Sequence, residues 1–215
     1  MSNDKQLKQS VLDELNWEPS INSAHIGVTT KDGVVTLMGH VDSYAQKQAA
    51  EKATLRVKDV KAVAEEIEVR LPSSVKHGDA EIAAAAVDRL AWDGSVPKDK
   101  VKAAVAKGWL TLTGQVEWHY QHDAAADAVR TLWGVTGVSN KITIKPRVDA
   151  GDIRDDIMIA LNRSWFSPEK IDVTAKDGKV TLTGTVDYWN ERAIAGSTAW
   201  AAPGVTSVVN DIFVH

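Results

Sequence analysis

Three stretches of the chain share one pattern: a turn with glycine, a strand that alternates apolar and polar residues, and a Gly-x-Val ending. They are KDGVVTLMGHV at 31–41, AKGWLTLTGQV at 106–116 and KDGKVTLTGTV at 176–186. From the strand glycine to a later valine the chain always runs 21 residues, at Gly39–Val60, Gly114–Val135 and Gly184–Val205. Such a fixed period indicates tandem copies of one supersecondary unit.

The order of helices and strands follows from periodicity within the first unit. Apolar residues at helical spacing predict a first helix with Asp4 as its N-cap. The Asp32-Gly33 pair predicts a tight hairpin, because both residues tolerate the positive φ that such a turn needs. Asp42 or Ser43 is expected to cap the second helix. The predicted elements are a helix over 4–16, strands over 25–30 and 34–41, a helix over 44–57 and a strand over 63–69.

The other two units repeat this register, so the sequence predicts an α+β fold. We expect three tandem αββαβ units, each with two helices packed on one face of a three-stranded mixed sheet. The small residues of the second helix, such as Ala50 and Ala53, would let that helix lie close to the sheet. The predicted domain boundaries are 1–72, 77–146 and 150–215.

Charge is distributed unevenly over a chain whose net charge is −4. Residues 1–75 carry 9 Lys+Arg and 11 Asp+Glu, residues 76–148 carry 10 and 8, and residues 149–215 carry 6 and 10. Only the middle unit is therefore basic, and weakly so. A general nucleic-acid binder would show a stronger basic bias, so we expect no nucleic-acid partner.

The chain has no cysteine, which excludes disulfides and thiolate chemistry. We expect no transmembrane segment, because no apolar run approaches the roughly 20 residues that span a bilayer. The first residues are polar and lack the apolar core of a signal peptide. If Met1 is the native start, the expected compartment is therefore the cytoplasm.

The quoted residues resemble the BON domain, a bacterial module named for osmotically inducible and nodulation proteins. The resemblance is carried by the hairpin, the Thr-Leu-x-Gly-x-Val strand, the Ala-rich second helix and a Gly-Val-x-x-Val segment such as 134–138. The first unit departs from that last segment, with Asp59 before Val60. The resemblance implies a non-enzymatic protein linked to osmotic stress and to binding of phospholipid or envelope surfaces. It would also imply a periplasmic location.

Trp109 begins the middle copy of the strand, where Val34 and Lys179 stand in the other units. If Leu110 and Leu112 face the helices, Trp109 faces solvent or a neighbour. A tryptophan beside cations suits the headgroup region of an anionic membrane. The alternative is packing against another unit. The candidate lipid or partner surface comprises Trp109, Lys98, Lys100, Lys102, Lys107, Lys141, Lys145 and Arg147.

Other aromatic and ionisable residues have less specific patterns. Trp17, Trp92 and Trp165 recur after the first helix of each unit, which favours structural packing. His119 and His122 lie three residues apart beside Asp123, but no further ligand set accompanies them, so we expect surface or interface histidines and no metal. No motif supports catalysis, and we expect no enzyme activity, cofactor-binding residue or catalytic residue.

Two functions remain open from the sequence. The first is peripheral binding to an anionic phospholipid surface, weak and sensitive to salt. The second is a protein-interaction or scaffold module, with self-association or a protein partner and no lipid dependence, since eight tryptophans offer apolar contact surface.

Overall fold

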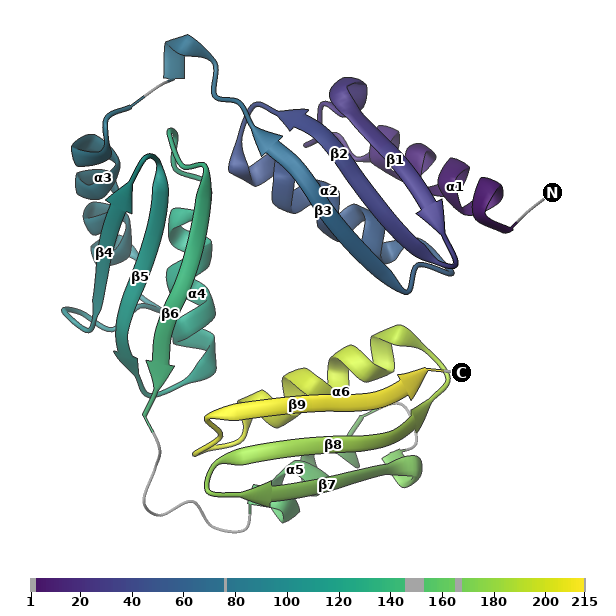
Figure 1. Cartoon of the computed structure of the whole chain (residues 1–215). Coiled ribbons are helices and arrows are strands. Elements are labelled where there is room, and N and C mark those ends of the chain that lie inside the picture. The colour runs from purple at the N-terminus through teal and green to yellow at the C-terminus, as the bar shows by residue number, and fades with distance from the viewer. Residues whose placement is uncertain (1–2, 76, 146–152, 165–167, 215) are drawn as a thin grey trace. The chain divides into compact units, whose positions relative to one another are not determined.

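A computed structural model describes residues 3–75, 77–145, 153–164 and 168–214. It contains the predicted element order three times (Figure 1). The first repeat comprises α1 (Asn3–Trp17), the 3-10 turn Ser23–His25, β1 (Ile26–Lys31), β2 (Val34–Val41), α2 (Tyr44–Arg56) and β3 (Ala62–Val69). The second comprises the 3-10 turn Ser73–Val75, α3 (Asp79–Trp92), β4 (Val101–Ala106), β5 (Trp109–Val116), α4 (His119–Val129) and β6 (Gly137–Ile144). The third comprises α5 (Ile153–Leu161), the 3-10 turn Pro168–Lys170, β7 (Ile171–Lys176), β8 (Lys179–Val186), α6 (Trp189–Ala201) and β9 (Ser207–Val214).

Each repeat builds its own three-stranded sheet, with the middle strand paired to both others. In the first sheet β1 runs antiparallel to β2, and β3 runs parallel to β2. The third sheet has the same pairing. The parallel pair needs a crossover, which α2 and α6 supply in their repeats. The predicted α+β fold of three αββαβ units with mixed sheets is therefore confirmed.

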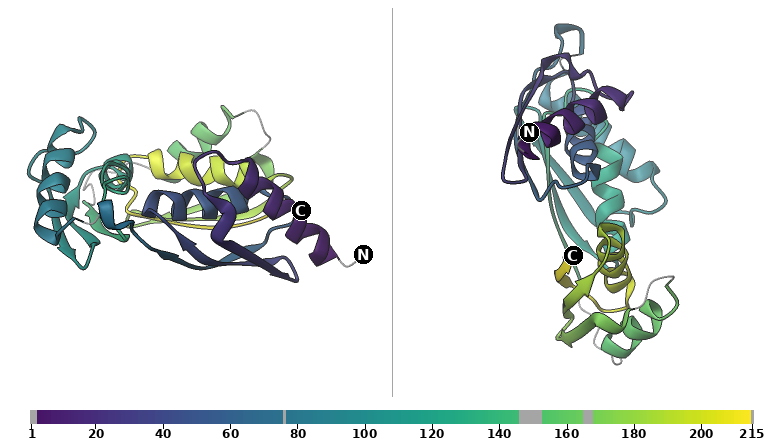
Figure 2. Two further views of the ribbon diagram at one scale, coloured as in Figure 1. Left: turned by 90° about the horizontal axis from the view of Figure 1, so that it is seen from above. Right: turned by 90° about the vertical axis from the view of Figure 1, so that its right-hand side faces the viewer.

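Both helices of a repeat cover the same face of its sheet. In the first repeat α1 packs on β1 and α2, while α2 packs on β2 and β3. The left view of Figure 2 shows this layering for the purple and blue repeat, with its helices on one side of its sheet. The core follows the predicted stripes. It includes Leu7, Val11 and Leu15 from α1, Val35 and Leu37 from β2, and Ala50 and Ala53 from α2.

Two backbone positions account for the recurring glycines of the pattern. Asp32 and Gly33 take φ values of 53° and 85°, as the predicted hairpin requires. Gly39 has a φ of 118°, and a Cβ there would overlap the carbonyl oxygen of His25. Because an L side chain suits neither that conformation nor that space, glycine is a backbone requirement at this point of β2.

The second helix of each repeat is tied to the third strand by polar contacts. In the first repeat Lys47 forms an ion pair with Glu65 at 2.7 Å, which explains a carboxylate on the helix side of β3. In the third, Arg192 donates to the carbonyl oxygens of Asn210 and Ile212 at 2.6 and 2.9 Å. These contacts fix which side of each second helix faces the sheet.

One of the two N-caps predicted for the second helix is confirmed, whereas the predictions for Asp4 and for two tryptophans are wrong. Ser43 is the N-cap of α2 and accepts from the backbone of Gln46, whereas Asp4 lies inside α1. Trp17 and Trp92 do not pack into their repeats, since their side chains are 83% and 87% exposed. Trp17 lies two residues after the buried Leu15, and Trp92 lies two residues after the buried Leu90. Each tryptophan therefore lies roughly 200° around the helix from the last core leucine. The predicted packing role is therefore wrong for both, and Trp165 lies outside the described residues.

Candidate surface-binding site

Trp109 lies on the sheet face that the helices leave open. Its neighbours Leu110 and Leu112 are fully buried beneath the helices, and alternation along β5 points Trp109 the opposite way. The indole ring crosses onto β6, where it covers Gly137, and its Nε1 donates to the hydroxyl of Ser139 at 3.1 Å. Half of the side chain, 49%, stays exposed. The predicted direction of Trp109 is correct, and its ring is held by one hydrogen bond.

Two of the candidate lysines share this face with Trp109. Since Gly137 and Ser139 lie beside the indole, the alternation of β6 brings Lys141 to the same side. Along β4 the half-buried positions alternate with exposed ones, and Lys102 is exposed. We call the exposed residues Lys102, Trp109 and Lys141, with the neutral residues between them, the open face of the second sheet.

The remaining candidate lysines are exposed but lie at other places. Lys107 occupies the β4–β5 turn, two residues before Trp109, and Lys98 lies in the loop before β4. Lys100 and Lys145 line a separate cavity of about 480 Å³ at one end of the sheet, together with the acidic Asp99 and Glu117. The lysines that the sequence grouped together therefore do not form one surface in the structure. Arg147 lies outside the described residues.

Charge distinguishes the open face of the second sheet from its two counterparts. The strands β4, β5 and β6 contain no Asp or Glu at any position. The first sheet instead exposes Glu66 and Glu68 on β3. The third exposes Asp172 and Asp211, which occupy the positions of Lys102 and Lys141 one repeat later. Sequence reasoning missed this contrast, although aligning the three repeats would have exposed it.

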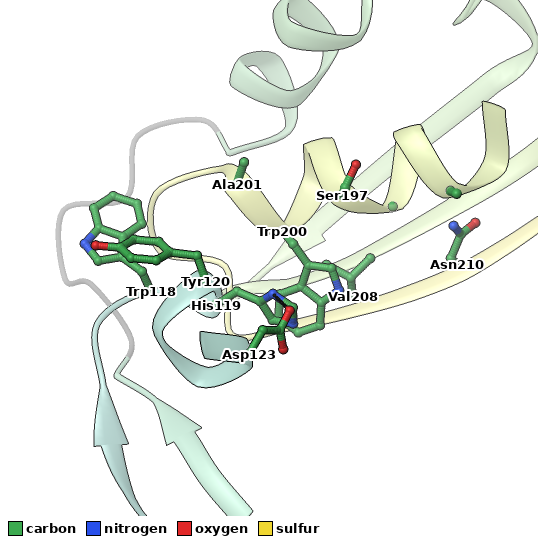
Figure 3. A pocket seen from close by; sticks show the side chains of 11 residues that line it. Trp118, His119, Tyr120, Asp123, Ser197, Trp200, Ala201, Val208 and Asn210 are labelled. Atoms are coloured by element: carbon green, nitrogen blue, oxygen red, sulfur yellow. Dashed lines mark ion pairs between the residues drawn. The ribbon is translucent and has the colours of Figure 1, made fainter. Parts of the chain in front are cut away.

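A second polar cluster lies at the start of α4. One carboxylate oxygen of Asp123 lies 3.1 Å from His119 Nδ1, and the other lies 2.9 Å from His122 Nδ1. Figure 3 shows His119 and Asp123 side by side on the first turns of this helix. The two imidazole rings stack with centroids 5.5 Å apart. Burial lowers the pKa of His119, the Asp123 charge opposes that shift and His122 adds to it.

The repeated unit, with two helices on one face of a three-stranded sheet, defines a small α+β module. The BON domain family model matches residues 3–70, 78–146 and 149–214. The chain therefore belongs to the BON-domain family, with three tandem copies, as the resemblance predicted.

Among curated proteins the chain is similar to "Osmotically-inducible protein Y" of Escherichia coli (strain K12). The two are 33% identical over 144 residues, which cover 65% of this chain and 70% of the relative. Among solved structures it matches CdsD, a structural protein of the type III secretion system of Chlamydia trachomatis. That match has 16% identity, a TM-score of 0.26 and coverage of 98% of this chain and 92% of the other. The C-terminal domain of CdsD gives 17% identity, the same TM-score and 96% coverage of both chains. A TM-score this low supports no conclusion about the present chain.

Within the residues that the structure describes, no helix has both the length and the apolar composition needed to cross a bilayer.

Proposed function

We propose that this chain is a non-enzymatic, stress-associated protein that binds anionic phospholipid surfaces through the open face of its second sheet. The stress association rests on the similarity to a protein named for osmotic induction. The observation that carries the lipid proposal is the pairing of a half-exposed tryptophan with Lys102 and Lys141 on strands that contain no carboxylate.

The chemistry of this face suits a membrane headgroup region. An indole partitions to the interface between water and lipid, where its apolar ring and its N–H are both accommodated. Each cation near an anionic membrane contributes about 1 kcal/mol. Lys102 and Lys141 lie on strands that contain no Asp or Glu, which leaves their charge available to phosphate groups. Two cations and one indole give weak and reversible binding, which fits a peripheral role.

The test is co-sedimentation with phosphatidylcholine vesicles that contain increasing fractions of phosphatidylglycerol. The parent chain should bind in proportion to the anionic lipid. The double variant Lys102→Asp/Lys141→Asp should bind at least about tenfold more weakly, since two favourable charges become unfavourable. Trp109→Ser should also weaken binding, because it removes the indole and leaves the charges.

The third repeat offers matched controls for both changes. Lys176→Asp/Lys179→Asp alters the net charge of the chain by the same amount but lies on β7 and β8. That control should retain most of the binding, as should Lys179→Ser, which changes the position equivalent to Trp109. Equal losses in both double variants would show that binding follows net charge alone and would contradict the assignment to the second sheet. Absence of binding to any vesicle would exclude the lipid function.

A protein-interaction function is the second candidate, favoured by the exposure of Trp17 and Trp92. Exposed tryptophans are frequent anchors at protein interfaces. Multi-angle light scattering of the parent and of Trp17→Ser/Trp92→Ser tests this reading for self-association. A parent mass above that of one chain, lowered in the variant, would support it. A monomeric parent would remove self-association from consideration.

A further inference from the structure

We propose that His119, His122 and Asp123 form a binding site for a divalent transition metal ion of the zinc type. Each residue offers one ligand atom, and these atoms all lie within 4.8 Å of one another. All three ligands lie on α4, and the ring of His119 also stacks on Trp200 of α6 with centroids 3.9 Å apart. The site is independent of the proposed lipid function.

The spacing of the three residues explains why one helix can present them together. Positions i, i+3 and i+4 of an α-helix point to the same side, so His119, His122 and Asp123 converge. The backbone of this turn is also anchored, because Asn140 of β6 donates to the carbonyl oxygen of His122 at 2.7 Å. That contact holds the helix turn against the strand. A ligand set on an anchored turn loses less freedom on binding an ion.

The nitrogen–oxygen distances in the cluster are close to those between neighbouring ligands of a tetrahedral ion. Zinc binds imidazole nitrogen and carboxylate oxygen at about 2.0–2.2 Å, which places neighbouring ligands roughly 3.3 Å apart. His119 Nδ1 lies 3.1 Å from one oxygen of Asp123 and His122 Nδ1 lies 2.9 Å from the other, and one ligand atom from each residue lies within 4.8 Å of the other two. A small outward movement of the Asp123 side chain, which is exposed, would admit the ion between the three groups. Three protein ligands leave a fourth position to water.

The ligand types select the class of metal. Two imidazoles and one carboxylate suit zinc, nickel or copper, whereas magnesium and calcium prefer a shell of oxygens. The cluster is also specific to the second repeat. The equivalent positions are Tyr44, Lys47 and Gln48 in the first repeat and Trp189, Arg192 and Ala193 in the third. Lys47 and Arg192 contact the third strand of their sheets, whereas His122 contacts Asp123. We therefore expect one ion per chain.

The sequence alone favoured surface or interface histidines at this place. It showed His119 and His122 on one helix face but could not show that the Asp123 carboxylate contacts Nδ1 of both rings. The same arrangement without a metal is a hydrogen-bonded cluster in which the carboxylate orients two imidazoles. The two readings differ in whether an added ion binds saturably to the three side chains.

Isothermal titration calorimetry of the untagged full chain with Zn²⁺, and separately with Ni²⁺, tests the proposal. The expected result is saturable binding of one ion per chain that excess Mg²⁺ does not displace. His119→Gln, His122→Gln and Asp123→Asn should each weaken binding more than about tenfold, since each removes a ligand. Circular dichroism of each variant checks that the fold is kept, and Asp123→Asn alone suffices if a histidine variant unfolds.

Two control variants separate this site from incidental metal binding. Asp127→Asn changes an exposed carboxylate on the same helix, which pairs with Arg130 at 2.6 Å. His25→Gln/His40→Gln removes the stacked pair of imidazoles in the first repeat. Both controls should bind zinc as the parent does. The proposal is overturned if the parent binds no ion, if Asp123→Asn binds as tightly as Asp127→Asn, or if loss of the His25–His40 pair abolishes binding.

Discussion

The indole of Trp109 depends on the absence of a side chain at Gly137. A Cβ at that position would overlap the six-membered part of the ring. The ring is the movable partner, so Gly137→Ala should push it away from β6 and break its hydrogen bond to Ser139. We expect a loss of about 1 kcal/mol in unfolding free energy, at the low end for overpacking because half of the ring is exposed.

An NMR spectrum of the indole N–H groups, with Trp109 assigned by its loss in Trp109→Phe, checks this prediction. The Trp109 signal should shift strongly in Gly137→Ala and less in Ser139→Ala, which removes the hydrogen bond and leaves the ring in place. An unchanged signal in Gly137→Ala would show that the ring does not cover Gly137 in solution.

At the scale of single residues, the sequence predicted which way a side chain points better than it predicted what that side chain contacts. Alternation along 109–116 placed Trp109 opposite the helices, because the buried Leu110 and Leu112 determine the phase of the strand. Because Trp17 and Trp92 recur at equivalent positions, the sequence suggested that both are buried. Recurrence shows only that the same residue type stands at this position in each repeat. Their angle to the core stripe decides exposure, and a shift of two residues from Leu15 or Leu90 turns the side chain outward.

At the scale of elements, Asp79 joins the first turn of α3 to the β4–β5 hairpin. Its two carboxylate oxygens accept from the backbone of Gly108 at 2.9 Å and of Lys107 at 2.8 Å. The Gly108 bond, then the Lys107 bond, lowers the pKa of Asp79 below its ordinary value. A carboxylate with a lowered folded-state pKa stabilises the fold above its unfolded pKa, near 3.9, and loses that contribution as pH falls through the folded value.

Asp79→Asn should therefore destabilise the second repeat at pH 7 and have a smaller effect at pH 3. The readout is the urea midpoint at each pH, followed through amide signals of β4 and β5. Asp88→Asn, on an exposed position of the same helix, should leave the midpoint unchanged at both pH values. A parent–variant difference that is equally large at pH 3 would mean that the Asp79 charge is not what holds the hairpin.

Element order was the part of the fold that sequence predicted most fully, because period-2 and period-3.6 patterns recur in register three times. The sequence did not predict that the candidate lysines lie at separate places in the structure. Lys100 and Lys102 are two residues apart, yet Lys100 lines the cavity at the sheet end, whereas Lys102 lies on the open face. The sequence pattern did not show where β4 begins, and that point decides which lysine belongs to the paired strand.

At the scale of the whole molecule, the negative net charge of the chain and the weakly positive charge of its second repeat have opposite effects on binding to an anionic membrane. The salt concentration sets the distance over which these charges act. The chain carries −4 overall, whereas residues 76–148 carry 10 Lys+Arg against 8 Asp+Glu. At roughly 0.01 M salt the Debye length is about 30 Å, so an anionic vesicle repels the chain as a whole. At roughly 0.15 M it is about 8 Å, so the vesicle interacts mainly with the face that lies on it, and at about 1 M even that attraction is screened.

The bound fraction of the full chain on anionic vesicles should therefore pass through a maximum as salt rises from about 0.01 to about 1 M. Co-sedimentation across that series measures it, with pure phosphatidylcholine vesicles as the baseline. The Lys102→Asp/Lys141→Asp variant should show no maximum, because the open face of its second sheet no longer supplies an electrostatic attraction that high salt would screen. A steady fall in parent binding from the lowest salt would mean that the acidic first and third repeats do not oppose the approach of the second to the membrane.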